Sequence, residues 1–452
     1  MSRWSVYVPT EKVPWNLARV VHLHRRAGFA ATWLELQRDL ADGPERAVSR
    51  LLNGTSRSEG VPEDFEALSA TISCAALCAG DPGRLKAWWI YRCLFTPDPL
   101  GERLTLMWHN HFATSLVKVT NRSAMHQQNQ RLRQYARGEF GTLLAAMLED
   151  PALLVWLDAT ENRPGHPNEN LAREVLELFS LGIGHYSEDD IREAARALTG
   201  LEIQDGIARL DLPRHDGGLK TIFGKSGAFR PRDLLDLLIS HPATSERLAW
   251  RLCREFCGEN AVDPRAIKEL ADGLRANRLR IDWAVETILR SELFYDASNL
   301  HCRVADPASF LLSLLRALEC CDPPPSTLAL ADALRSAGLD LFVPPNVGGW
   351  PGGRAWLSTR TVLARGKAIV DLAYGRLHSS TVPIDPQPLL ERHRGGESLP
   401  DQVRFLGTLF WGDIDHRLVD ELSHAARDEA DRPSQLRRVL ILMLTRSQAH
   451  LH

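Results

Sequence analysis

Apolar residues recur along most of this chain with the spacing of one face of an α-helix. In the segment that follows Ser187, for example, Ile191, Ala194 and Leu198 share one face, and Gly200 ends the run. A period of about 3.6 residues is typical of amphipathic helices that pack around a core. The pattern therefore predicts an all-α protein whose body is a large, bundle-like assembly of many helices.

Residues that commonly begin helices are spread along the chain. Thr32 and Glu35 have the spacing of a capping box. Three Asp-Pro pairs combine an N-cap with a first-turn proline, because aspartate accepts bonds from free amides and proline has no amide to leave unsatisfied there. These pairs are Asp150-Pro151, Asp263-Pro264 and Asp306-Pro307. Each of these signals predicts the start of a helix.

Two segments interrupt the helical pattern. Near residues 201–212, two short strand-like runs flank Asp205-Gly206, which predicts one small β-hairpin followed by an ordered loop. Residues 343–353 (VPPNVGGWPGG) contain prolines and paired glycines, which exclude a regular helix and predict a second ordered loop. We expect a main helical body over residues 1–300 and a C-terminal helical region over 301–452, or a single domain.

Composition excludes several classes of protein. Lys and Arg (54) nearly balance Asp and Glu (57) among 452 residues, so no general nucleic-acid-binding surface is expected. No run of eighteen apolar residues and no signal-peptide core occur, so we expect a cytoplasmic protein without membrane contact. Neither a Gly-x-Gly-x-x-Gly motif after a strand nor a Walker motif is present, so no nucleotide cofactor is expected.

The sequence Trp-His-Asn-His contains the first candidate site residues, His109 and His111. Residues two apart lie about 200° apart around a helix. Both imidazoles can bind one ion only if the segment is extended or ends a helix. Otherwise one binds while the other packs, or each has a hydrogen-bonded structural role.

A helix predicted from Asn168 supplies the second set of candidates. Arg173, Glu174 and Glu177 fall on one polar stripe, and two carboxylates three residues apart can point to the same spot. Such pairs bind metals in di-iron bundles, although the Glu-x-x-His spacing of those sites is missing here. The alternative is a solvated face with an Arg173–Glu177 ion pair.

The third set lies on a glycine-bearing loop that contains His215, Asp216 and Lys220. These side chains could supply a metal ligand, a base or orienting carboxylate, and a cation. The alternative is an Asp-Gly turn with exposed charges.

These motifs also resemble those of a known family. The similar segments are residues 22–29, 88–115, 168–200, 215–224 and 344–365. Together they resemble the bacterial family "domain of unknown function 1800" over nearly the whole chain. Ala30 departs from the usual Gly-Phe-Gly. The resemblance implies that the three candidate sets form one pocket. The neighbourhood of its genes implies a protein partner from the sulfatase-like "domain of unknown function 1501" family.

Two hypotheses follow. The first is a metal-dependent enzyme, oxidoreductase or hydrolase, which uses iron, manganese, zinc or copper. Its metal ligands would be His109, His111, Glu174, Glu177 and His215. Asp216, Lys220 and Arg173 would be catalytic, with the cations holding an anionic substrate group. The second is a non-catalytic helical scaffold or partner of the sulfatase-like protein, in which Trp350 and Trp356 serve as core plugs or interface anchors. A metal-free enzyme based on the Asp216–Lys220 loop is the remaining alternative.

Overall fold

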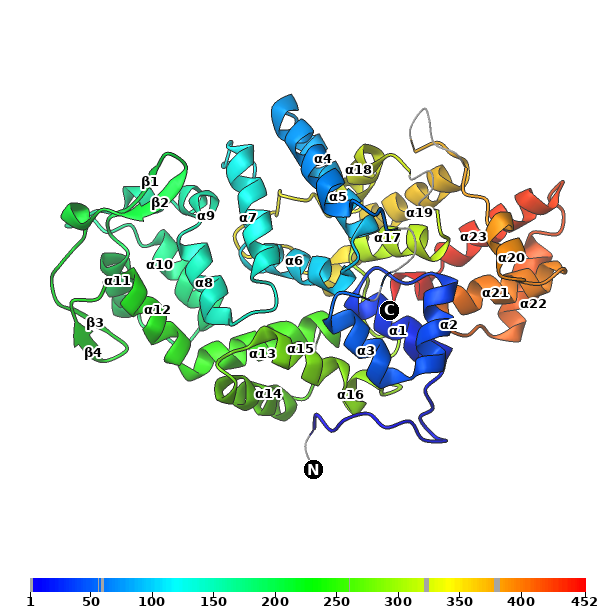
Figure 1. The fold of residues 1–452 in the computed structure, drawn as a ribbon, viewed down its shortest axis with the longest axis horizontal. Helices are drawn as coiled ribbons and strands as arrows, with labels where there is room; N and C mark the ends of the chain where they lie inside the picture. The colour runs from blue at the N-terminus through cyan, green and yellow to red at the C-terminus, as the bar shows by residue number, and fades with distance from the viewer. Residues whose placement is uncertain (1–2, 56, 58–60, 260, 321–324, 378–382) are drawn as a thin grey trace.

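The computed structural model describes residues 3–55, 57, 61–259, 261–320, 325–377 and 383–452 (Figure 1). These residues form helices connected by loops, with two separate two-stranded antiparallel sheets. The predicted all-α fold class is confirmed.

The first third of the chain is helical throughout. Its elements are α1 (Leu17–Ala27), α2 (Trp33–Asp42), α3 (Pro44–Leu52), α4 (Phe65–Ala79), α5 (Pro82–Phe95), α6 (Pro99–His111), α7 (Arg122–Gln134), α8 (Phe140–Leu148), α9 (Pro151–Trp156) and the 3-10 turn η1 (Ala159–Glu161).

The middle of the chain contains both sheets. Its elements are α10 (Asn170–Glu174), the π-helical turn η2 (Val175–Ser180), α11 (Glu188–Ala197), β1 (Leu201–Gln204), β2 (Ile207–Leu210), the 3-10 turn η3 (Leu212–Arg214), β3 (Lys220–Ile222), β4 (Lys225–Gly227), α12 (Pro231–Ser240), α13 (Pro242–Phe256), α14 (Pro264–Ala276), α15 (Ile281–Leu289) and α16 (Glu292–Tyr295).

The last third returns to helices. Its elements are α17 (Pro307–Ala317), α18 (Thr327–Ser336), the 3-10 turn η4 (Gly353–Leu357), α19 (Thr359–Ala373), α20 (Gln387–Arg392), α21 (Leu399–Trp411), α22 (His416–Ala425), α23 (Arg432–Leu444) and the 3-10 turn η5 (Ser447–His450).

The predicted helix starts are confirmed. Thr32 and Glu35 form the reciprocal capping box of α2. The three Asp-Pro pairs begin α9, α14 and α17, and each aspartate accepts a backbone N–H from the first turn. These local hydrogen bonds explain why the boundaries could be placed from the sequence alone.

Both sheets are hairpins with tight turns. In the predicted hairpin, Leu201 pairs with Leu210, and Asp205 and Gly206 both have positive φ. The segment after it was expected to be loop only, and this is wrong at β3 and β4. A second hairpin turns there at Phe223 and Gly224, again with two positive φ values. Its strands of three residues are too short to show an alternating pattern.

The core consists of two hydrophobic clusters. One joins the N-terminal segment and α3 to the helices from α6 to α16. In the other, α4 and α5 pack with the helices that follow residue 305, and α5 lies against α17 and α18 (Figure 1). Because the second cluster contains helices from both ends of the chain, packing does not follow a division at residue 300. That boundary stays a prediction.

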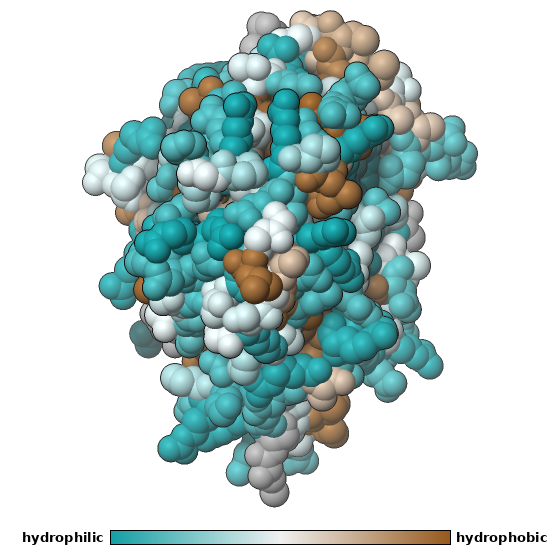
Figure 2. Space-filling model, turned by 90° about the vertical axis from the view of Figure 1, so that its left-hand side faces the viewer, coloured by the Kyte–Doolittle hydropathy of each residue, from teal (hydrophilic) through white to brown (hydrophobic). Residues whose placement is uncertain are grey.

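The end of the molecule that carries α11 and the hairpins has a polar surface. Figure 2 shows this face as mostly hydrophilic, with small, separate apolar patches. None of the helices in the described ranges combines the length and the apolar character needed to cross a membrane.

Candidate functional site

The two histidines of α6 point into different parts of the core. The ring of His109 packs against Trp89, Phe342 and Trp350, with centroid distances of 5.1, 5.5 and 5.8 Å. His111 lies instead among other aromatic rings, and its Nε2 is 3.1 Å from the carbonyl oxygen of Phe179. This divergence is what a separation of about 200° around a helix dictates.

Both imidazoles are neutral at pH 7. Burial lowers the pKa of His109 to about 3. Burial also lowers the pKa of His111 far below its usual value, and the nearby charges of Arg251 and Arg247 add to this effect. These two rings therefore act as packed aromatic groups on opposite sides of α6.

The helix with the candidate carboxylates widens into the π-helical turn η2. The Leu181 amide donates to the Leu176 carbonyl, five residues back, at 2.9 Å. Glu177 lies within this turn and accepts a 2.6 Å hydrogen bond from the Tyr186 hydroxyl. Burial, and then the charge of Glu177, raise the pKa of Glu174. The two carboxylates thus influence each other, as their spacing predicts.

Arg173 does not take part in that carboxylate pair. Its guanidinium binds Glu188 at 2.9 Å and Glu169 at 3.1 Å. The alternative ion pair with Glu177 is therefore wrong. The wider π-helical turn changes the angular position of Glu177 relative to a regular α-helix.

The loop with His215, Asp216 and Lys220 is bound to its own surroundings. His215 Nδ1 is 3.0 Å from the Thr199 carbonyl oxygen. Asp216 forms a 2.7 Å ion pair with Arg196, which holds the pKa of Asp216 below its usual range. Lys220 is only 1% exposed, and its ammonium donates to the carbonyls of Asp216 and Gly218. These contacts stabilise the loop and the second hairpin.

The predicted metal ligands are not gathered around one point. In the part of the chain that the structure describes, no three His, Cys, Asp or Glu side chains are grouped in a way that could hold a metal ion. Of the five predicted ligands, His109, His111 and His215 each have separate surroundings. Only Glu174 and Glu177 interact with each other. The structure gives no support to a metal site built from all five, and that site stays a prediction.

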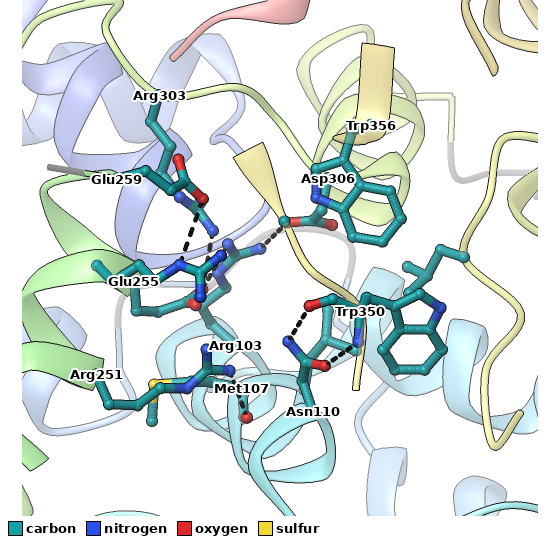
Figure 3. A pocket seen from close by; sticks show the side chains of 14 residues that line it. Arg103, Met107, Asn110, Arg251, Glu255, Glu259, Arg303, Asp306, Trp350 and Trp356 are labelled. Carbon is teal, nitrogen blue, oxygen red and sulfur yellow. Dashed lines mark hydrogen bonds and ion pairs between the residues drawn. The ribbon is translucent and has the colours of Figure 1, made fainter. Parts of the chain in front are cut away.

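A small pocket, with an interior of about 50 Å³, lies where α6 and α13 meet the start of α17 and the Gly-Trp loop, residues 343–353 (Figure 3). Its arginines are Arg103, Arg251, Arg254 and Arg303. Its carboxylates are Glu255, Glu259 and Asp306. Indole rings of Trp350 and Trp356 complete the wall on the side of the loop.

Regular helix geometry places the charged residues. Arg254 and Glu255 follow Arg251 by three and four residues on α13 and so share its side of the helix. Asp306 caps α17 by accepting the Ser309 amide at 2.9 Å. Because Asp306 is the N-cap of α17, the start of this helix places a carboxylate in the pocket.

The residue between the two histidines fixes the Gly-Trp loop. Asn110 Oδ1 accepts the Trp350 amide at 2.7 Å, and its Nδ2 donates to the Trp350 carbonyl at 3.3 Å. Gly349 has a φ of +76°, and a Cβ there would overlap both the side chain and the carbonyl of Asn110. Only glycine allows the loop to approach α6 this closely and close the pocket.

Part of the pocket is a neutralised ion cluster. Arg103 binds Glu255 at 2.6 Å and Asp306 at 2.7 Å, and Arg303 lies 3.3 Å from Glu255. Although burial opposes ionisation, the guanidinium groups hold the pKa values of Glu255 and Asp306 below their usual ranges. The same carboxylates raise the pKa of Arg103. These groups stay charged at neutral pH, so neither carboxyl has a proton to donate as a general acid.

Arg251 is different from the other buried arginines of the pocket. It is 8% exposed, and its Nη2 donates to the Met107 carbonyl at 3.1 Å. Within the described residues it has no carboxylate at ion-pair distance, and its buried Nε has no hydrogen-bond partner. Burial lowers its pKa to about 10, so the guanidinium remains charged at pH 7. A buried charge without a counterion is costly.

This pocket was missed by the sequence analysis. The available signal was the spacing of Arg247, Arg251 and Arg254, which puts three arginines on one face of α13. Buried arginines are rare, so such a row is ordinarily taken as solvated. Trp350 and Trp356 were singled out as plugs or anchors, and they do line the pocket.

Comparison with known proteins supports the resemblance seen in the sequence. The family model described as "Protein of unknown function (DUF1800)" matches residues 22–450, which is nearly the whole chain. The chain belongs to this family. The DUF1800 match spans every residue of the pocket, from Arg103 to Trp356.

No curated protein and no solved structure matches the chain. Membership of the DUF1800 family therefore supplies no activity for this protein, and its function has to be argued from the site itself.

Proposed function

We propose that this protein binds a small anionic ligand in the pocket, and that Arg251 is the principal anion-binding residue. The observation that carries the proposal is the buried guanidinium of Arg251, which has no carboxylate partner among the described residues. Glu255 compensates this charge only from beyond ion-pair distance, so the protein gains by binding an anion directly there.

The surroundings of Arg251 support an anion in particular. Arg254 lies one turn further along α13 and also lines the pocket. Its nearest carboxylate, Glu259, is 3.7 Å away, which leaves the guanidinium loosely paired. Two guanidinium groups on one helix face offer several N–H donors to the oxygens of a carboxylate, sulfate or phosphate.

A binding experiment on the purified full chain tests this proposal. Sulfate and acetate are titrated at constant ionic strength against a chloride blank, and both binding heat and melting temperature are measured. We expect saturable binding that weakens about tenfold or more in Arg251→Gln, because a charge-assisted contact is worth about 1.5–3 kcal/mol.

Arg232→Gln serves as the matched control, since Arg232 is an exposed arginine on α12. It should bind anions as the unchanged protein does. If neither anion binds the unchanged protein, or if Arg251→Gln binds both with undiminished affinity, the proposal is wrong.

A metal-dependent enzyme is a second candidate, favoured by the electrostatic coupling of Glu174 and Glu177. Elemental analysis tests it: a stoichiometric transition metal should be found, and it should be lost in a Glu174→Gln, Glu177→Gln double variant. The scaffold hypothesis stays a prediction that co-purification with the sulfatase-like protein would test.

A further inference from the structure

Two cysteines of this protein, Cys257 and Cys302, lie beside each other although 45 residues separate them in the sequence. The Sγ atom of Cys302 is 3.4 Å from the carbonyl oxygen of Cys257. A Cβ at Gly258 would lie 3.7 Å from the Cα of Arg303, so the two backbones also lie against each other directly after the cysteines. A disulfide needs Cα atoms about 4.4–6.8 Å apart, and therefore requires backbones as close as these.

The two thiols differ in exposure and share a neighbour. Cys302 is exposed, whereas Cys257 is buried. Asn299 Oδ1 is 3.2 Å from the Sγ of Cys302. Burial raises the pKa of Cys257 to about 12, although the charge of Arg26 and a hydrogen bond with the Asn299 side chain oppose this rise. A reagent in solution therefore reaches Cys302 first, and Cys257 remains a protected thiol behind it.

A buried arginine contacts the exposed thiol. Arg26 is 0% exposed, and its Nη2 donates to the Sγ of Cys302 at 3.2 Å. Its other hydrogen bonds go to the carbonyls of Phe256 and Asn299, both at 2.9 Å. Among the residues that the structure describes, Arg26 has no carboxylate at ion-pair distance, and its buried Nε has no partner. A thiolate at Cys302 would supply the missing counterion, and the thiolate is the form of cysteine that reacts with peroxides.

We propose that Cys302 is a site of oxidation by hydroperoxides, and that Cys257 converts the product into a disulfide. In the first step, the Cys302 sulfur attacks hydrogen peroxide: an S–O bond forms, the O–O bond breaks, and the leaving hydroxide becomes water with the proton that the thiol has lost. Sulfur is oxidised to a sulfenic acid and the peroxide is reduced. In the second step, the Cys257 sulfur attacks the sulfur of Cys302: the S–S bond forms, the S–O bond breaks, and the hydroxyl group leaves as water with the Cys257 proton.

This oxidation site adjoins the anion-binding pocket but does not belong to it. Cys257 follows Glu255 by two residues, and Cys302 directly precedes Arg303. Glu255 and Arg303 line the pocket, whereas neither cysteine does. Oxidation of the thiols and binding of an anion are therefore separate properties, and either can be present without the other.

Peroxide treatment of the reduced full chain at pH 7 tests the proposal. Hydrogen peroxide is added with and without dimedone, which traps sulfenic acids, and peptide mass spectrometry follows each cysteine over time. Cys74 and Cys78 are exposed thiols of α4 and serve as internal controls. We expect the dimedone adduct to form about tenfold or more faster at Cys302 than at either control. Without dimedone, a Cys257–Cys302 disulfide should form, and dithiothreitol should reverse it.

Conservative variants separate the two steps. Cys257→Ser should leave the rate of adduct formation at Cys302 unchanged and abolish the disulfide, so that the sulfenic acid persists. Cys78→Ser is the matched control and should change neither result. Adduct formation at Cys302 no faster than at Cys74 and Cys78 would overturn the proposal. So would a sulfenic acid that persists in the unchanged protein as it does in Cys257→Ser. Both of these outcomes can be read without any buried substitution if Cys257→Ser fails to fold, because the unchanged protein alone shows whether the disulfide forms.

Discussion

Lys220 and Arg251 are both buried cations, but the partners that surround them differ. Lys220 donates to two carbonyls of its own loop, and that loop is held by the ion pair between Asp216 and Arg196. Arg251 donates to one backbone carbonyl; burial and nearby arginines lower its pKa, and the charge of Glu255, one turn further along α13, opposes them. Burial of a charged residue therefore does not mark a site by itself. Nor does the lack of a carboxylate partner, because among the described residues Arg26 and Arg365 are fully buried without one and donate to backbone carbonyls; Arg251 is set apart because it also lines a pocket.

The two regions should differ most in the cost of removing a carboxylate. Asp306→Ala leaves Arg103 buried with one partner fewer and removes the N-cap of α17, so we expect a loss of about 3–5 kcal/mol in the free energy of unfolding. Asp216→Ala breaks a partly exposed pair and should cost about 1 kcal/mol or less. Urea unfolding of both variants measures the difference, and equal losses would contradict the comparison.

Substitution of a glycine in the Gly-Trp loop and in the His215–Lys220 loop should give the next largest difference in stability. Gly349→Ala forces a Cβ into Asn110 at a positive φ, so we expect a loss of about 3 kcal/mol together with loss of anion binding. Gly217→Ala meets no atom within 4 Å and should be nearly neutral. Melting curves with and without sulfate check both variants. A Gly349→Ala protein of unchanged stability would show that the loop does not need this close approach.

Acid should lower the stability of the protein through His109, whose ring packs against Trp89, Phe342 and Trp350. The unfolded chain protonates His109 near pH 6.5, whereas the folded chain does so only near pH 3. The unfolded state therefore binds more protons in this range, and stability falls as the pH drops from about 6.5 toward 3. His109 alone accounts for about 2 kcal/mol at pH 5.

The measurement is the difference in unfolding free energy between pH 7.5 and pH 5, which should be about 2 kcal/mol smaller in His109→Phe than in the unchanged protein. An identical pH dependence in both proteins would show that His109 is not buried as a neutral ring.

The smallest effects are expected at the two cations themselves, and they have opposite signs. Arg251→Met removes a desolvated charge and should stabilise the ligand-free protein by about 1 kcal/mol while abolishing anion binding. Lys220→Met leaves two carbonyls without their donor and should destabilise by about 1–2 kcal/mol. Thermal unfolding without added anions gives both values. Destabilisation by Arg251→Met would mean that the arginine has a structural role.

Much of the local structure could be predicted because its causes are local. The capping box at Thr32, the caps at the Asp-Pro pairs and the turn at Asp205-Gly206 each depend on residues close together in the sequence. The separation of His109 from His111 also follows from helix geometry alone.

The pocket could not be predicted in this way because its interactions are distant in sequence. Arg103 meets Asp306 across 203 residues, and Asn110 meets Trp350 across 240. The π-helical turn η2 has no simple sequence signal. Within it, Glu177 accepts a hydrogen bond from Tyr186 and does not pair with Arg173. For Arg251, the deciding property is a missing partner, which only the folded arrangement reveals.

The bond between Asn110 and Trp350 also bears on the order of events during biosynthesis. A ribosome adds about 5–20 residues per second, so roughly 12–48 seconds separate the synthesis of these two partners. Until then the arginines of α6 and α13 lack the covering loop, and before residue 306 is made they lack Asp306 as well. The nascent chain therefore carries exposed positive groups that the finished protein hides, and the pocket is complete only after three quarters of translation.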